Sequence, residues 1–272
     1  MPFPLAHPVL VLPFRKLCPE RLSMVGLVIG SIVPDLGYAI REFDWNVFTH
    51  SVAGSFVFCL PVGLVAAYVV FAIRRPLAGT LPNPHRQLLA PLCMNGVPPW
   101  RRLALSLLIG AWSHIALDAL THESALLAES RPALRDAFSE VERRGLEIYH
   151  ALWILVSSFG LGLLGWLYLR FLKRSTGSFR LVAPGECGRT LVWLGLFAVP
   201  YLVVVPFAYH MLEPGGFRVD RYALYGSLGP YLMLLTFEVI SFGWFLRRRE
   251  TKRHQTTAPA ATKSSDNPAP SG

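Results

Sequence analysis

The chain has 272 residues, of which 53% are hydrophobic and only 16% are charged. Soluble domains average about 25% charged residues, and the mean hydropathy is +0.41, so the composition favours an integral membrane protein. The net charge of +9 does not indicate nucleic-acid binding, because many basic residues lie in short runs beside apolar segments. The four cysteines form no CxxC pair, which excludes a zinc ribbon of that type.

Apolar segments in chain order predict an all-α, polytopic transmembrane bundle. Residues 1–20 are apolar but interrupted by prolines, and we expect a re-entrant or interfacial segment because a span needs about 20 residues. About six spans follow, and the polar residues 251–272 are expected to form a disordered tail after a membrane domain of residues 1–250. The predicted spans are residues 22–40, 51–73, 103–122, 149–172, 190–211 and 223–246.

Basic residues at the ends of these segments predict the orientation of the bundle. The clearest basic runs all fall on one side, which the positive-inside rule assigns to the cytoplasm together with the C-terminus. These runs are Arg74-Arg75, Arg101-Arg102, Lys173-Arg174 and Arg247–Arg249. Asp35, His50, His122 and His150 then lie near the opposite, outer face of the membrane.

The predicted span 103–122 carries three polar residues that require an explanation. His114 and Asp118 are four residues apart and therefore share one helix face, and His122 follows one turn later, displaced by about 40°. An Asp within a span costs about 2.5–3.5 kcal/mol on insertion scales and usually faces a partner or a cavity. This face is either a metal-ligand or proton-handling face or a buried polar pair that fixes helix packing.

Histidines and acidic residues elsewhere in the chain provide possible partners for this face. Neutral imidazoles and carboxylates suit Zn²⁺ or another divalent transition metal. Catalytic roles are predicted for His122 and for Glu123, which lies next to it and could act as a general base. The predicted metal ligands are His7, Asp35, His50, His114 and Asp118.

Several short motifs, taken in order, resemble a known family. They are Met1-Pro2-Phe3 with His7-Pro8, Gly30-Ser31 with Pro34-Asp35, His50-Ser51, and Gly110-x-x-Ser113-His114-x-x-x-Asp118-x-x-Thr121-His122. This set resembles the bacterial membrane family catalogued as domain of unknown function 4184, over most of the chain to about residue 245. More distantly it is similar to inner-membrane metal-dependent hydrolases of the YdjM type, whose motif residues correspond to His7, Asp35, His50, His114 and Asp118.

These observations lead to three functional hypotheses. The first is a metal-dependent hydrolase in the bacterial cytoplasmic membrane, with a centre near the outer leaflet that acts on a phosphoester, lipid or envelope-linked substrate. The second is a non-enzymatic membrane scaffold whose His/Asp pairs fix helix packing. The third is a transporter or metal-handling protein that uses the same polar residues as a pathway. Membrane lipids are the expected partners in each case.

Overall fold

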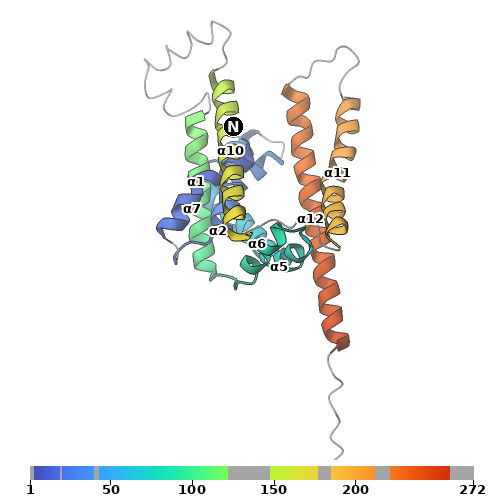
Figure 1. Ribbon diagram of the computed structural model, residues 1–272. Helices are drawn as coiled ribbons and strands as arrows, with labels where there is room; N and C mark the ends of the chain where they lie inside the picture. The colour runs from blue at the N-terminus through green and yellow to red at the C-terminus, as the bar shows by residue number, and fades with distance from the viewer. Residues whose placement is uncertain are drawn as a thin grey trace, which may run out of the picture.

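The computed structural model describes residues 3–18, 20–39, 43–121, 148–176, 185–211 and 221–257 (Figure 1). All regular elements in these ranges are helical, which confirms the all-α prediction. Short helices come first: η1 (Pro4–Ala6), α1 (Pro8–Leu17), α2 (Met24–Gly30), η2 (Val33–Ala39), α3 (Phe43–Thr49), α4 (Val52–Gly54) and the π-helical turn η3 (Ser55–Cys59). The remaining helices are α5 (Leu60–Thr80), α6 (His85–Cys93), α7 (Trp100–Thr121), α10 (Ile148–Thr176), α11 (Glu186–Met211) and α12 (Arg221–Thr257).

Three helical stretches are long and apolar enough to cross a membrane, namely Val52–Thr80, Ile154–Ser175 and Glu186–Val204. They overlap the second, fourth and fifth predicted spans. Large apolar side chains project from them to the outside of the fold, and Phe159 and Leu202 are each 66% exposed. Contact with lipid removes the cost that water would impose on such surfaces. These features support a membrane protein.

The first predicted span, residues 22–40, is not one continuous helix. α2 has only seven residues and ends at Gly30, and η2 follows with Pro34 in its first turn. Proline fits there because its missing N–H has no helical partner in a first turn. Seven helical residues rise about 10 Å, far less than a hydrocarbon core of about 30 Å. The described ranges therefore contain three candidate spans, and the total of six stays a prediction.

α2 and α7 approach each other so closely that small residues are required between them. A Cβ added to Gly26 would lie 2.8 Å from the Cβ of Ser106, and one added to Gly110 would lie 2.8 Å from the backbone nitrogen of Ser31. Gly26 and Gly30 on α2, like Ser106 and Gly110 on α7, are spaced four residues apart. This small-xxx-small spacing allows two helix backbones to approach within a membrane.

Two hydrogen bonds show that α2 and α7 run in parallel. The backbone N–H of Ser23 donates to Ser106 Oγ at 2.8 Å, and the ring Nδ1 of His114 lies 2.8 Å from the carbonyl oxygen of Ser31. The residues of both pairs are 83 positions apart in the sequence. A constant offset means that the two helices advance in the same direction. α2 ends at Gly30, and η2, which follows it, also contacts α7.

The N-terminal segment, defined here as residues 3–17, packs against α10. The backbone N–H of Phe3 donates to Ser157 Oγ at 2.8 Å. A Cβ added to Gly160 would lie 2.8 Å from the Cβ of Ala6, so the chain passes directly over this glycine. The apolar helical stretch Pro4–Phe14 is shorter than a membrane span. Its helices also contact α2 and α7.

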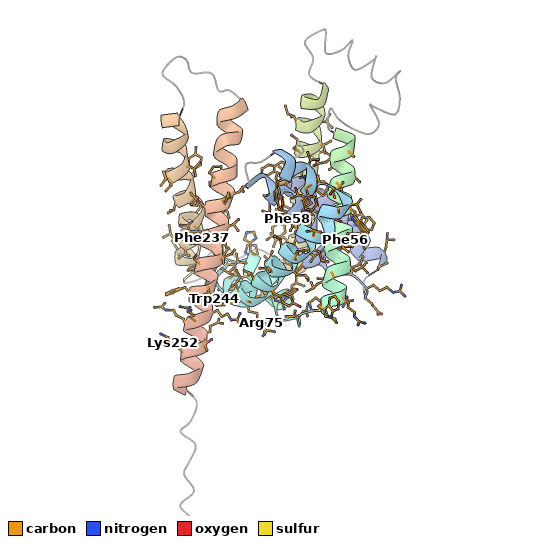
Figure 2. All side chains as sticks on the ribbon, turned by 180° about the vertical axis from the view of Figure 1, so that it is seen from behind. Phe56, Phe58, Arg75, Phe237, Trp244 and Lys252 are labelled. Carbon is orange, nitrogen blue, oxygen red and sulfur yellow. The ribbon has the colours of Figure 1, made fainter. Side chains whose placement is uncertain are left out.

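α12 lies beside α11 and α5 and extends beyond the rest of the bundle (Figure 1). A Cβ added to Gly243 would lie 2.8 Å from the Cβ of Ile73, which marks the close contact with α5. Figure 2 shows Phe237 in the middle of α12 and Lys252 near its lower end, and Phe237 is 71% exposed. α12 continues to Thr257, so residues 251–257 are helical, whereas residues 258–272 lie outside the described ranges.

Candidate metal centre

Four predicted metal ligands meet at one place in the structure. Asp35 comes from η2, His50 directly follows α3, and His114 and Asp118 occupy successive turns of α7. Each residue offers one ligand atom, and these four atoms all lie within 4.8 Å of one another. The parallel packing of α2 and α7 explains this convergence, since the offset of 83 that pairs Ser31 with His114 also relates Asp35 to Asp118.

Imidazoles and carboxylates alternate around the centre at nearly equal distances. His114 Nε2 lies 3.4 Å from Asp35 Oδ1 and 3.3 Å from Asp118 Oδ2. His50 Nε2 lies 3.6 Å from Asp35 Oδ1 and 3.5 Å from Asp118 Oδ2. These separations are longer than the 2.7–3.2 Å typical of N–H···O hydrogen bonds. Among the described residues, neither Asp35 oxygen nor His114 Nε2 has a hydrogen-bond partner, although all three atoms are buried.

The same separations match four of the six edges of a metal coordination tetrahedron, and the two remaining separations, between the imidazoles and between the carboxylates, are within 4.8 Å. Zinc binds imidazole nitrogen and carboxylate oxygen at about 2.0–2.1 Å, and the edge of a regular tetrahedron is 1.63 times that length, or about 3.3–3.4 Å. The four nitrogen–oxygen separations of 3.3–3.6 Å are close to this value. The residues present therefore fit a divalent ion placed between them better than they fit direct hydrogen bonds to one another.

A hydrogen bond at Nδ1 of His114 fixes the ring so that the second ring nitrogen, Nε2, points to the centre. A carbonyl oxygen can only accept, so the Nδ1–H of His114 donates to Ser31 O at 2.8 Å. Nε2 faces Asp35 and Asp118, and in the neutral ring this nitrogen carries the lone pair that a metal would use. Metal-binding histidines almost always have such a partner on the second nitrogen, because it fixes the tautomer and the ring orientation.

Charge and burial also favour a cation. The side chains of Asp35 and Asp118 are only 8% and 7% exposed, and His114 is fully buried. Two buried carboxylates require compensation, and a divalent cation neutralises both.

His50 is the most accessible of the four residues, with 14% of its side chain exposed. Its Nδ1 lies 3.2 Å from the hydroxyl oxygen of the buried Thr49. Large apolar side chains close to His50 or Asp35 in the sequence are exposed: Val47 is 59% exposed, Val52 66% and Leu36 44%. The centre is therefore closed at His114 and most open at His50.

The fifth predicted ligand, His7, lies next to this group but is not one of the four. Its ring is completely buried and stacks on the His114 ring, with centroids 3.8 Å apart and planes inclined by 21°. Its Nε2 lies 3.9 Å from Asp118 Oδ1, the carboxylate oxygen that does not form the contacts with His114 and His50.

The remaining predicted site residues are not placed by the structure. His122 and Glu123 lie outside the described residues, so their catalytic roles stay predictions. His150 belongs to α10, but its side chain also lies outside the description. Metal-ligand roles for His7, Asp35, His50, His114 and Asp118 likewise stay predictions, now with defined geometry.

Three residues that shape the centre were not identified from the sequence. Ser31 acts through its backbone carbonyl, and this gives no side-chain signal. Thr49 contacts the His50 ring, and its place directly before His50 in Thr49-His50-Ser51 was the available clue. Gly160 is important only because Ala6 passes over it, and a single glycine in an apolar helix does not reveal such a contact.

Comparison with known proteins assigns the chain to a family. The family model described as domain of unknown function (DUF4184) matches residues 1–227, which include every residue of the centre. No curated protein and no solved structure matches the chain significantly. The distant similarity to YdjM-type hydrolases stays a prediction. Because the model covers well over half of the sequence, the chain belongs to the DUF4184 family.

Proposed function

We propose that this protein is a membrane-embedded hydrolase whose centre is a divalent metal ion held by Asp35, His50, His114 and Asp118. The observation that carries the proposal is the set of four imidazole–carboxylate separations of 3.3–3.6 Å. Hydrogen-bonded packing pairs would be shorter, whereas ligands that share one ion are held apart at about these distances.

The donor set indicates which metals would bind. Two imidazole nitrogens and two carboxylate oxygens suit zinc and other divalent transition metals, while calcium and magnesium prefer oxygen ligands alone. When bound, such an ion supplies Lewis-acid polarisation of a carbonyl or phosphoryl oxygen and an activated water. The chain would hold the ion through its four ligands, and the hydrogen bond from His114 to the Ser31 carbonyl orients one of them. Zinc is our proposed occupant.

The apolar surroundings support an amphiphilic substrate. Leu36, Val47 and Val52, which are neighbours of Asp35 or His50 in the sequence, are exposed, and lipid tails can lie against them. The predicted topology puts Asp35 and His50 near the outer leaflet. We therefore propose that the scissile ester or phosphoester belongs to a lipid or to an envelope-linked molecule.

The number of ligands supports a second candidate, a metal that only fastens helices together. Catalytic zinc sites usually have three protein ligands and an open position, whereas structural sites use four. However, structural zinc sites are dominated by cysteine, and this centre has only histidine and aspartate. Ligand type thus favours the hydrolase, and ligand number favours the scaffold.

Metal analysis followed by an activity assay separates these functions. Protein purified in detergent should contain stoichiometric metal, which His114→Ala should abolish. His85→Ala is the matched control, because His85 starts α6 and contacts Tyr168 rather than the centre. Micelle-embedded chromogenic phosphomonoesters, phosphodiesters and carboxylic esters should then be tested with and without a chelator.

The outcomes are distinct. Hydrolysis that stops on chelation and returns with added zinc supports the hydrolase. Stoichiometric metal without hydrolysis of any of the three substrate classes favours the scaffold. Metal uptake by protein-containing vesicles would favour the transporter. Wild-type protein without metal, whose metal content and stability do not change in His114→Ala, refutes the metal centre.

A further inference from the structure

We propose that His7 is a positioning residue of the metal centre rather than a fifth ligand, and that its docking on α10 completes the centre. The proposal rests on the metal centre proposed above. It assigns a role to the N-terminal segment, which contributes none of the four ligands.

Two contacts of the His7 ring are with ligands on α7. Its ring covers one face of the His114 imidazole, with centroids 3.8 Å apart. Its Nε2 faces Asp118 Oδ1 at 3.9 Å, within ion-pair range.

The two oxygens of Asp118 have different neighbours. Oδ2 lies 3.3 Å from His114 Nε2 and 3.5 Å from His50 Nε2, as expected for the oxygen that shares the ion with them. Oδ1 faces His7 instead. A ligating carboxylate whose second oxygen meets a neighbouring group cannot rotate freely, and such partners typically change metal affinity by about 10–100-fold.

α10 determines where His7 lies, although it supplies none of the four ligands. The Phe3 N–H bond to Ser157 Oγ anchors the beginning of the segment. Ala6, directly before His7, lies against Gly160, where an added Cβ would be 2.8 Å from the Ala6 Cβ and 3.1 Å from its carbonyl oxygen. A methyl group at position 160 must therefore displace Ala6, and His7 with it.

Cobalt binding by the full-length protein in detergent tests this role. Co²⁺ is the probe, because its visible absorption reports the number and type of ligands and its titration gives the affinity. We compare wild type with His7→Ala, His7→Gln and Gly160→Ala. His114→Ala shows the spectrum of a lost ligand, and His85→Ala is a control histidine that packs on α10 at Tyr168.

We expect His7→Ala to bind Co²⁺ about 10–100-fold more weakly with an unchanged absorption spectrum. His7→Gln should recover part of the affinity, because the amide N–H can donate to Asp118 Oδ1. Gly160→Ala should weaken binding in the same way, although the substitution is outside the centre. His85→Ala should bind like wild type.

Two results would overturn the proposal while leaving the metal centre intact. A changed Co²⁺ spectrum in His7→Ala would make His7 a ligand. Wild-type affinity in both His7→Ala and His7→Gln would remove its positioning role. If wild-type protein does not bind Co²⁺ at all, the metal centre itself fails and this proposal falls with it. Thermal unfolding shows whether either His7 variant is misfolded. If one is, the Co²⁺ affinity and spectrum of the other His7 variant distinguish these outcomes.

Discussion

Substitution of Gly110 by alanine tests whether the close packing of α2 on α7 builds the centre. The new methyl group would lie 2.8 Å from the Ser31 nitrogen and 2.9 Å from the Gly30 carbonyl carbon. Both are backbone atoms, which cannot rotate away as a flexible side chain can. The helices must therefore separate, and Ser31 must move relative to the His114 ring to which its carbonyl is bonded.

The expected cost follows from three contributions. Overpacking costs about 1–3 kcal/mol, and weakening of the His114–Ser31 hydrogen bond adds about 1 kcal/mol. Replacement of a helical glycine by alanine returns about 0.8–1 kcal/mol. The net loss is about 2 kcal/mol, which lowers the unfolding temperature by about 4–8 °C for a chain of this size. Metal affinity should fall as well, because the His114 ring is no longer fixed.

Thermal unfolding in detergent at a constant scan rate measures this loss, with metal titration as the second readout. Gly162→Ala is the matched control, since α10 leaves open space at that position. It should unfold at the wild-type temperature or slightly above it, because it gains helix propensity without a clash. If Gly110→Ala matches wild type in both stability and metal affinity, the close parallel packing described here is wrong.

Three further predictions concern the centre and the topology. Asp35→Asn keeps the shape of the side chain but removes its charge, so metal content should fall sharply by elemental analysis; unchanged content would exclude Asp35 as a ligand. Chelation should lower the unfolding temperature, because an ion at 100 times its dissociation constant stabilises the fold by about 2.7 kcal/mol; a chelator-insensitive melting curve would contradict a bound metal. A membrane-impermeant maleimide should label the exposed Cys18 and Cys187 from the cytoplasmic side only. The buried Cys59 should react only after denaturation. Labelling of Cys18 and Cys187 from opposite sides would refute the six-span topology.

Hydropathy predicted helices well where a long apolar run continues without a break. The run from residue 51 forms a continuous helical stretch to Thr80, because each backbone group finds its partner within the helix. The run 22–40 is also apolar but divides between α2 and η2. Hydropathy averages side-chain character over a window and does not register a turn of the backbone near Ser31 and Pro34.

The local part of the centre was also predictable from the sequence. His114 and Asp118 share a face because the helical period requires residues four apart to do so. The residue types of Asp35 and His50 identified them as partners. That Asp35 and His50 meet His114 and Asp118 was inferred from topology and motif resemblance. In the structure the four ligand atoms lie within 4.8 Å of one another.

Composition and helical periodicity are local properties, and they were enough to predict the helical class, the preference for a membrane environment and the chemical identity of the donor groups. Which donors meet depends on contacts between distant elements. The parallel packing of α2 against α7 brings Asp35 to Asp118, and it depends on contacts between small residues 83 positions apart. The difference between His7 and the two histidines of the centre, His50 and His114, depends on which Asp118 oxygen each one faces. Distances of this kind arise from packing between elements remote in sequence, and spacing along one helix cannot encode them.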